Sequence, residues 1–334
     1  MKSKNIILIL CLILSILLFG FIQAGCSDQE STGYKITVTT FPIYDFVKNI
    51  VGDSAKVTLL LNPGAEVHSY EPTANDIVTI ASSDMFIYIG GPNDAAVVKA
   101  IESESTIKDS VKLVKLLDFV TAKEEELVPG MQDEDEHDHD DGEESDADHD
   151  HDDGDEDAEI DEHIWLSPAN VKLIVTGVKN LLVSSDSDNA EKYKTNTDAY
   201  NEKLTKLQAD YTEMIATATL KKIVVADRFP FRYLVDEFGL EYSAALVGCA
   251  HDADITPATI AGLIEIVRTE NIPYVFYVEL SDMGAANTIA EATGCKTALL
   301  HSAERPTQEE FDNGISYLEI MESNLEALRL ALNP

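Results

Sequence analysis

Two histidines occur in sequence contexts that suit metal binding. His68 lies in NPGAEVHSYEP (Asn62–Pro72), after an apolar strand and a Pro-Gly turn and just before Thr73, a plausible helix N-cap. His163 lies in DEHIWLSP (Asp161–Pro168), where an acidic tract gives way to apolar residues. An imidazole that is held at the edge of an ordered element can donate an electron pair to zinc, copper or manganese. For either residue alone, a solvated histidine without a special role is the alternative interpretation.

Between these histidines lies a low-complexity insertion, residues 131–162. Its part from Asp133 to Glu162 holds 20 acidic residues and no Lys or Arg. A segment so charged and so poor in apolar residues cannot form a packed core. The insertion contributes two HxH pairs that could bind metal weakly as accessory sites: His137, His139, His149 and His151. The alternative is a solvated acidic loop.

The charge of the chain restricts its partners. The formal net charge is −37, of which the acidic insertion accounts for more than half. The remainder is still strongly negative, so it repels nucleic acid and anionic lipid and favours a cationic ligand.

The first residues resemble a targeting segment. Lys2 and Lys4 precede an apolar run from Ile6 to Ile22, which predicts a signal peptide over residues 1–25. Ala24-Gly25-Cys26 favours cleavage before Cys26 and lipidation of that cysteine, although Gln23 occupies a position where lipoproteins normally have an aliphatic residue. We therefore expect an extracytoplasmic protein that is lipid-anchored to the cell membrane. A cleaved soluble protein and an uncleaved membrane anchor are the alternatives.

Two cysteines remain once the signal peptide is removed and Cys26 carries a lipid. They are Cys249 and Cys295, and a disulfide is the only intramolecular pairing open to them in an oxidising compartment. Two buried free thiols, or a thiolate that binds metal, are the alternatives.

The alternation of strand and helix patterns predicts an α/β fold. We expect two lobes, each with a mostly parallel sheet flanked by helices. The N-terminal lobe covers residues 34–186 and the C-terminal lobe covers residues 221–334. We expect a long helix over residues 187–218 to join them as a spine, because its apolar residues recur at steps of four and three along one narrow stripe. An ordinary helix of one domain is the alternative. Ligands of such sheets bind near the carboxyl ends of the strands, which here is the cleft between the lobes.

The pair NPGAEVHSYEP and DEHIWLSP resembles the metal-binding solute-binding lipoproteins of bacterial ABC importers for zinc and manganese (the cluster A-I family). The resemblance extends over essentially the whole mature chain and is greatest to the zinc branch, where acid- and histidine-rich insertions occur. It implies a metal site of four positions, of which the first two match His68 and His163. The third position is histidine in zinc members and glutamate in manganese members, and here it matches Arg228. Arginine stays protonated and cannot coordinate a metal, so Asp227 is the nearest substitute.

The fourth position of that family matches His301, where relatives usually have aspartate. Glu279, which ends the strand YVFYVE, matches a glutamate near the cleft and is either a ligand or a partner of a ligand. The predicted ligands are therefore His68, His163 and His301, completed by Glu279, Asp227 or water, with His251 as a weaker candidate. Three imidazoles and one oxygen form a common zinc shell, whereas manganese prefers more oxygen ligands. Zinc (Zn²⁺) is therefore the predicted ion and manganese (Mn²⁺) the second candidate.

The resemblance implies that the protein captures zinc outside the cell and delivers it to the membrane permease of an ABC importer, which works with its ATPase. We expect a monomer that performs no catalysis. A manganese-binding homologue, a secreted metallohydrolase and a surface adhesin are the alternatives, and the absence of an HExxH motif weighs against the hydrolase.

Overall fold

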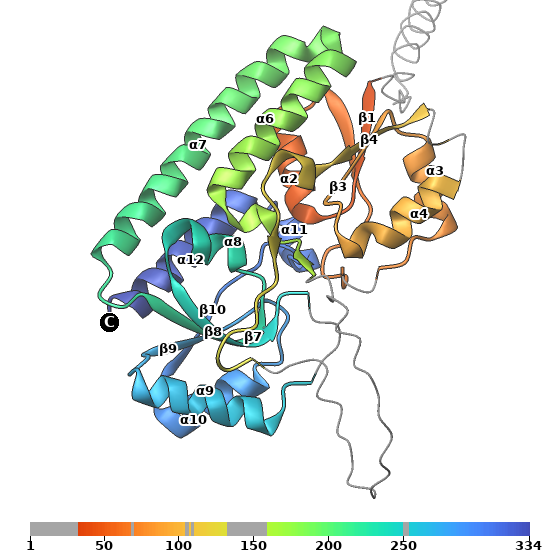
Figure 1. Ribbon diagram of the computed structural model, residues 1–334. Helices are drawn as coiled ribbons and strands as arrows, with labels where there is room; N and C mark the ends of the chain where they lie inside the picture. Colours follow the sequence, from red (N-terminus) through yellow and green to blue (C-terminus); the bar gives the residue numbers. More distant parts are fainter. Residues whose placement is uncertain (1–32, 68–69, 104–106, 108–109, 132–158, 250–253) are drawn as a thin grey trace, which may run out of the picture. The chain divides into compact units, whose positions relative to one another are not determined.

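In a computed structural model, the described residues are 33–67, 70–103, 107, 110–131, 159–249 and 254–334. Residues from Tyr34 to Pro334 form one compact unit, shown in Figure 1. Within the described residues, no helix is long and apolar enough to cross a membrane.

The N-terminal part of this unit is built on four parallel strands in the order β2-β1-β3-β4. These strands are β1 (Tyr34–Val38), β2 (Ala55–Leu59), β3 (Met85–Tyr88) and β4 (Lys112–Lys115). The elements that connect them are α2 (Phe41–Val51), α3 (Ala74–Ala81), η1 (Pro92–Asp94), α4 (Ala95–Ser103) and, after β4, η2 (Leu116–Phe119). Parallel neighbours require such crossover connections, because a tight turn cannot bring the chain back in the same direction.

The C-terminal part has a second parallel sheet in the order β10-β9-β7-β8. Its strands are β7 (Lys222–Phe229), β8 (Glu241–Val247), β9 (Tyr274–Tyr277) and β10 (Lys296–Leu299). Its helices are α8 (Arg232–Phe238), α9 (Pro257–Thr269), α10 (Gly284–Thr293), α11 (Gln308–Asp312) and α12 (Tyr317–Leu332). The two sheets confirm the predicted α/β fold with parallel sheets flanked by helices.

A short antiparallel ribbon pairs β5 (Lys123–Glu124) with β6 (Ile160–Asp161). β6 belongs to the last residues of the acidic insertion, so the pairing places this end of the insertion beside Lys123 and Glu124. The backbone N–H of Glu125 extends the ribbon by donating to the carbonyl of Glu159 at 2.8 Å. After β6 the chain enters η3 (Ile164–Leu166), α6 (Pro168–Ser185) and η4 (Ser187–Asn189). The ribbon therefore fixes the position of the backbone just before His163.

The long helix predicted for residues 187–218 is observed as α7 (Ala190–Thr217). It packs on α2 and α6 along one part of its length and on α8 and α12 along another (Figure 1). The apolar stripe read from the sequence is the buried side of the helix: Tyr200, Leu204, Leu207, Tyr211 and Met214.

One core of buried side chains runs from the first sheet, past α7, to the second sheet. Two tyrosines of α7 add hydrogen bonds from this helix to α2 and to α12. The Tyr200 hydroxyl donates to Asp45 of α2 at 3.1 Å, and the Tyr211 hydroxyl donates to the carbonyl of Met321 in α12 at 2.7 Å. Because the core is continuous, the boundaries of the two lobes stay a prediction.

Asp45 makes the stability of this core depend on pH. Burial raises the pKa of Asp45 to about 6, although hydrogen bonds from Tyr200 and Asn49 oppose the shift. The folded state therefore binds this proton more strongly than the unfolded state, whose aspartates titrate near pH ~3.9. The resulting contribution to stability is complete below the unfolded pKa and is lost as the pH rises through about 6.

We predict that Asp45→Asn, which keeps the shape of the side chain but cannot ionise, gains stability relative to the wild type as the pH rises. The gain between pH ~5 and ~7.5 should be about 1–2 kcal/mol. Urea unfolding of metal-free protein at the two pH values measures it, and Asp188→Asn, at an exposed carboxylate, controls for the lost charge. An equal difference from the wild type at both pH values would contradict the prediction.

Candidate metal site

Part of the predicted site falls within the described residues. His163, Asp227, Glu279 and His301 are described, and the last three lie near the carboxyl ends of strands of the second sheet. Outside the described residues lie His68, His251, the lipidation candidate Cys26, and the tract histidines His137, His139, His149 and His151.

His163 is held by the carboxylate of Asp161, at the end of β6. The backbone N–H of His163 donates to Asp161 Oδ1 at 2.8 Å, and the ring Nδ1 lies 3.0 Å from the same oxygen. Because Nδ1 faces the carboxylate, Nε2 is the ring nitrogen through which a metal would bind. The ring also hydrogen-bonds Cys249. The ring of Trp165 packs edge-on against it, with centroids 5.2 Å apart.

The environment of His163 favours its protonated form when no metal is bound. Complete burial opposes protonation, but the Asp161 carboxylate and hydrogen bonds with Asp161 and Cys249 outweigh burial and raise the pKa of His163 well above 6.5. A metal that binds this ring must therefore displace a proton.

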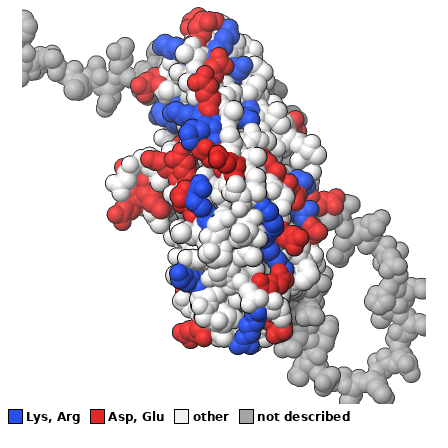
Figure 2. Space-filling view, turned by 90° about the vertical axis from the view of Figure 1, so that its left-hand side faces the viewer, with Lys and Arg blue, Asp and Glu red and all other residues white. Residues whose placement is uncertain are grey.

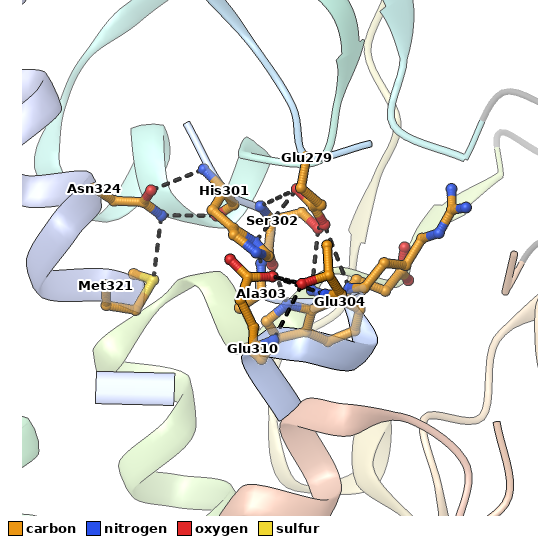
Figure 3. Close-up of polar contacts among 11 residues, drawn as sticks. Glu279, His301, Ser302, Ala303, Glu304, Glu310, Met321 and Asn324 are labelled. Carbon is orange, nitrogen blue, oxygen red and sulfur yellow. Dashed lines mark hydrogen bonds and ion pairs between the residues drawn. The ribbon is translucent and has the colours of Figure 1, made fainter. Parts of the chain in front are cut away.

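Glu279 shapes the loop that follows β10 (Figure 3). One carboxylate oxygen accepts the backbone N–H of Ser302 at 2.8 Å. The other accepts the Ser302 hydroxyl and the backbone N–H of Arg305, the latter at 3.3 Å. With both oxygens engaged, Glu279 is suited to position this loop.

His301 is buried beside the cleft. Its backbone N–H donates to Asn324 at 2.8 Å, and the Asn324 amide donates back to its carbonyl at 2.7 Å (Figure 3). The ring Nδ1 accepts the backbone N–H of Ala303 at 2.9 Å. A neutral ring with an accepting Nδ1 carries its proton on Nε2, and this nitrogen is buried without a hydrogen-bond partner among the described residues. In this tautomer neither ring nitrogen offers a lone pair to a metal. Nδ1 also lies 3.4 Å from a carboxylate oxygen of Glu279, and a ring that donated from Nδ1 to Glu279 would keep a lone pair on Nε2.

Glu304 is a cleft residue that the sequence analysis missed. It is 8% exposed and lines the same cleft as His163. Burial raises the pKa of Glu304 to about 7, while His163 lowers it, so the two side chains interact electrostatically. The only sequence signal is an acid in the loop after the last strand, three residues past His301, and such an acid is usually solvated.

Two arginines also reach the cleft. Arg228 follows the irregular part of β7, and its backbone N–H donates to Asp227 at 2.9 Å. The carboxylate of Asp227 also hydrogen-bonds Ser281, in the loop before α10, and Asp227 is not among the residues that line the cleft. Arg305 follows Glu304 and contacts Glu66.

The cleft is narrow, with room for little more than one water-sized body. Its polar lining comes from the second sheet and the β6 end: His163, Arg228, Glu279, Ser302, Glu304 and Arg305. Among the described residues, no three His, Cys, Asp or Glu side chains converge closely enough to hold a metal.

The predicted disulfide between Cys249 and Cys295 is not formed, because both cysteines are free thiols. Cys249 follows the carboxyl end of β8 and hydrogen-bonds His163, whereas Cys295 precedes the amino end of β10. β8 and β10 are the two edge strands of the parallel sheet. The cysteines therefore lie at opposite edges and opposite ends of the sheet, which a disulfide cannot span.

The comparisons with known proteins identify the class of protein that this fold and cleft define. Residues 36–331 match the family model for the zinc-uptake complex component A, periplasmic (ZnuA). The chain belongs to this family, which confirms the resemblance read from the two histidine motifs.

Individual relatives agree with this assignment. The chain is 32% identical over 307 residues to the zinc-binding lipoprotein AdcA of Streptococcus pneumoniae (strain ATCC BAA-255 / R6), covering 91% of this chain and 57% of AdcA. It is also 32% identical over 309 residues to the high-affinity zinc uptake system protein ZnuA of Bacillus subtilis (strain 168), covering 92% of this chain and 90% of that protein. The chain thus spans little more than half the length of AdcA.

A solved structure extends the likeness to three dimensions. The Zn(II)-bound ZnuA-like domain of S. pneumoniae AdcA superimposes with a TM-score of 0.72 and 29% sequence identity. The match covers 90% of this chain and all of that domain.

We predict that the two free thiols react at very different rates in the native protein. Burial raises the pKa of the Cys249 thiol to about 12, so only about one molecule in ten thousand carries a Cys249 thiolate at pH ~8. A disulfide-exchange reagent should label the Cys249→Ser variant readily through Cys295, and the Cys295→Ser variant only after unfolding. Comparable rates in the two variants, or no reaction of the wild type until a reductant is added, would contradict this arrangement.

Proposed function

We propose that this protein binds a zinc ion in the cleft and hands it to the permease of an ABC importer. The observation that carries the proposal is the Asp161–His163 pair, which fixes one imidazole in the lining of a narrow cleft that Glu304 also lines. Membership of the zinc-uptake family and the likeness to a zinc-binding lipoprotein support zinc as the ion.

The ligands that we propose are His163, Glu304 and His68, with water in the fourth position. His68 lies two residues beyond Glu66, which contacts Arg305 in the cleft lining. A shell of two imidazoles, one carboxylate and water suits zinc, which accepts nitrogen and oxygen donors in a tetrahedral arrangement. His301 stays a candidate ligand from the sequence, but its hydrogen bond from Ala303 supports a positioning role instead.

Delivery of zinc needs reversible coordination and no bond-breaking chemistry, so we propose a transport component rather than an enzyme. The signal-like residues 1–25 and Cys26, together with the lipoprotein relatives, support an extracytoplasmic, lipid-anchored location. We also propose that the two sheets belong to two lobes that hold the ion between them. A monomer that meets the permease with the cleft face is the simplest arrangement.

We predict that zinc titration by calorimetry of the chain lacking residues 132–158 gives one tight site. His163→Ala and Glu304→Gln should each weaken it at least about 100-fold, because each removes a ligand. His301→Ala should weaken it by no more than about tenfold, because it acts only through the loop. A loss in His301→Ala as large as in Glu304→Gln would restore His301 as a ligand.

The matched control for these variants is Glu310→Gln, which removes a carboxylate that caps α11 near the cleft without lining it. Wild-type protein that binds neither zinc nor manganese tightly would refute the proposed function itself.

We predict further that zinc binds more tightly as the pH rises. The pKa of His163 is raised well above 6.5, and burial raises that of Glu304 to about 7, so both ligands hold protons in mildly acidic solution. Each displaced proton should strengthen binding by up to about tenfold per pH unit below its pKa. Titration between pH 6 and 8 in buffers of different ionisation enthalpy measures the released protons. Zinc binding that releases no protons and has an affinity independent of pH would contradict this prediction.

A further inference from the structure

A carboxylate from the first half of the chain is held by two arginines from the second half. Arg305 contacts Glu66 through Nη1 and also donates from Nη2 to the carbonyl of Gly64 at 3.2 Å. Arg228 faces the same carboxylate, with Nη1 and Nη2 each 3.5 Å from one of its oxygens. Glu66 therefore lies between two guanidinium groups, an arrangement that we name the arginine clamp.

The clamp is partly withdrawn from water. The side chains of Arg305, Arg228 and Glu66 are 17%, 24% and 26% exposed. Ion pairs on an open surface contribute little, because water and salt screen them. A pair at this depth is screened less, and an arginine that bridges a carboxylate and a carbonyl is also fixed in direction.

The two arginines are anchored to the second sheet, Arg228 within a strand and Arg305 in the loop that follows β10. The backbone N–H of Arg305 donates to Glu279, the carboxylate that shapes the loop carrying Glu304. Arg228 belongs to β7, which pairs with strands on both sides. The clamp therefore joins the segment 62–67 to the elements that line the cleft.

The segment 62–67 also approaches the second half of the chain at Gly64. It leaves the first sheet after β2 and turns at Gly64, whose φ of +76° is a conformation that glycine adopts without strain. A Cβ at Gly64 would lie 3.9 Å from Cδ1 of Leu280, in the loop before α10. Gly64, like Glu66, is thus close to residues of the second half.

We infer that the arginine clamp is the device that retains the captured ion, by holding the segment 62–67 against the cleft. This inference rests on the proposed zinc-binding function. Arg305 and Arg228 act here as positioning residues, and neither contacts the ion. Loss of the clamp should let the segment lift away, so the ion should leave faster, whereas its rate of entry should change little.

The test is the rate at which zinc leaves the loaded full-length mature protein, followed by stopped-flow mixing with a chromogenic chelator. We expect Glu66→Gln and Arg305→Gln each to speed release about 10- to 100-fold. The double variant should speed release by less than the product of the two single effects, because both changes break the same Arg305–Glu66 contact. Arg305→Lys, which keeps the charge but cannot contact Glu66 and Gly64 together, should be intermediate.

The matched control is the exposed pair Glu326 and Arg329 on α12, which lie 3.3 Å apart and do not line the cleft. Glu326→Gln and Arg329→Gln should leave zinc release unchanged. Urea unfolding of each metal-free variant separates retention from stability, and Arg305→Lys keeps the test decisive if Arg305→Gln does not fold.

Three results would overturn the inference. They are release rates in the clamp variants equal to those of the control pair, additive effects in the double variant, and faster release only in proportion to lost stability. In each of these cases the wild type still binds zinc tightly, so the proposed function survives. A wild type that binds no zinc removes the proposed function and the inference together.

Discussion

The hydrogen bonds between Asp161 and His163 are the constraint on which the site depends. One carboxylate oxygen receives both the backbone N–H and the ring Nδ1 of His163, so the ring can neither rotate nor change its tautomer without losing a buried bond. Asp161 is held in turn by the β5–β6 ribbon. Tyr233 of α8 fastens that ribbon, because its hydroxyl donates to the carbonyl of Asp161 at 3.0 Å and accepts the backbone N–H of Lys123 at 2.9 Å.

The other wall of the cleft depends on a second carboxylate that is also fully engaged. Glu279 binds three groups of the loop after β10, and this loop carries Glu304 toward His163. The loop contains Ala303 at φ +62°, a conformation that costs a non-glycine residue free energy. The hydrogen bonds to Glu279 and to the ring of His301 compensate for this cost. Two carboxylates, Asp161 and Glu279, thus hold the two walls of the cleft through hydrogen bonds to the adjoining loops.

The buried core limits how far the two sheets can move relative to each other. A single cluster of buried residues continues along α7 from one sheet to the other. On the outside of the molecule, acidic and basic side chains are interspersed on the face that Figure 2 displays. Because packed interiors resist deformation, we expect the cleft to open through the segment 62–67 and its neighbours rather than through a wide rotation of the two sheets. A local gate of this kind suits an ion that needs little space.

The sequence by itself determined the α/β class, the parallel sheets, the long helix and the family, because these follow from apolar periodicity and from two distinctive motifs around His68 and His163. It also singled out Glu279 as a cleft residue. Only the tertiary structure decided what each polar side chain does. It separated Cys249 from Cys295, turned the ring of His301 toward Ala303, and brought Glu304 and Arg305 to the cleft. The physical reason is that strand order and loop direction, which set these contacts, arise from long-range pairing, whereas periodicity and motifs report only on near neighbours in the chain.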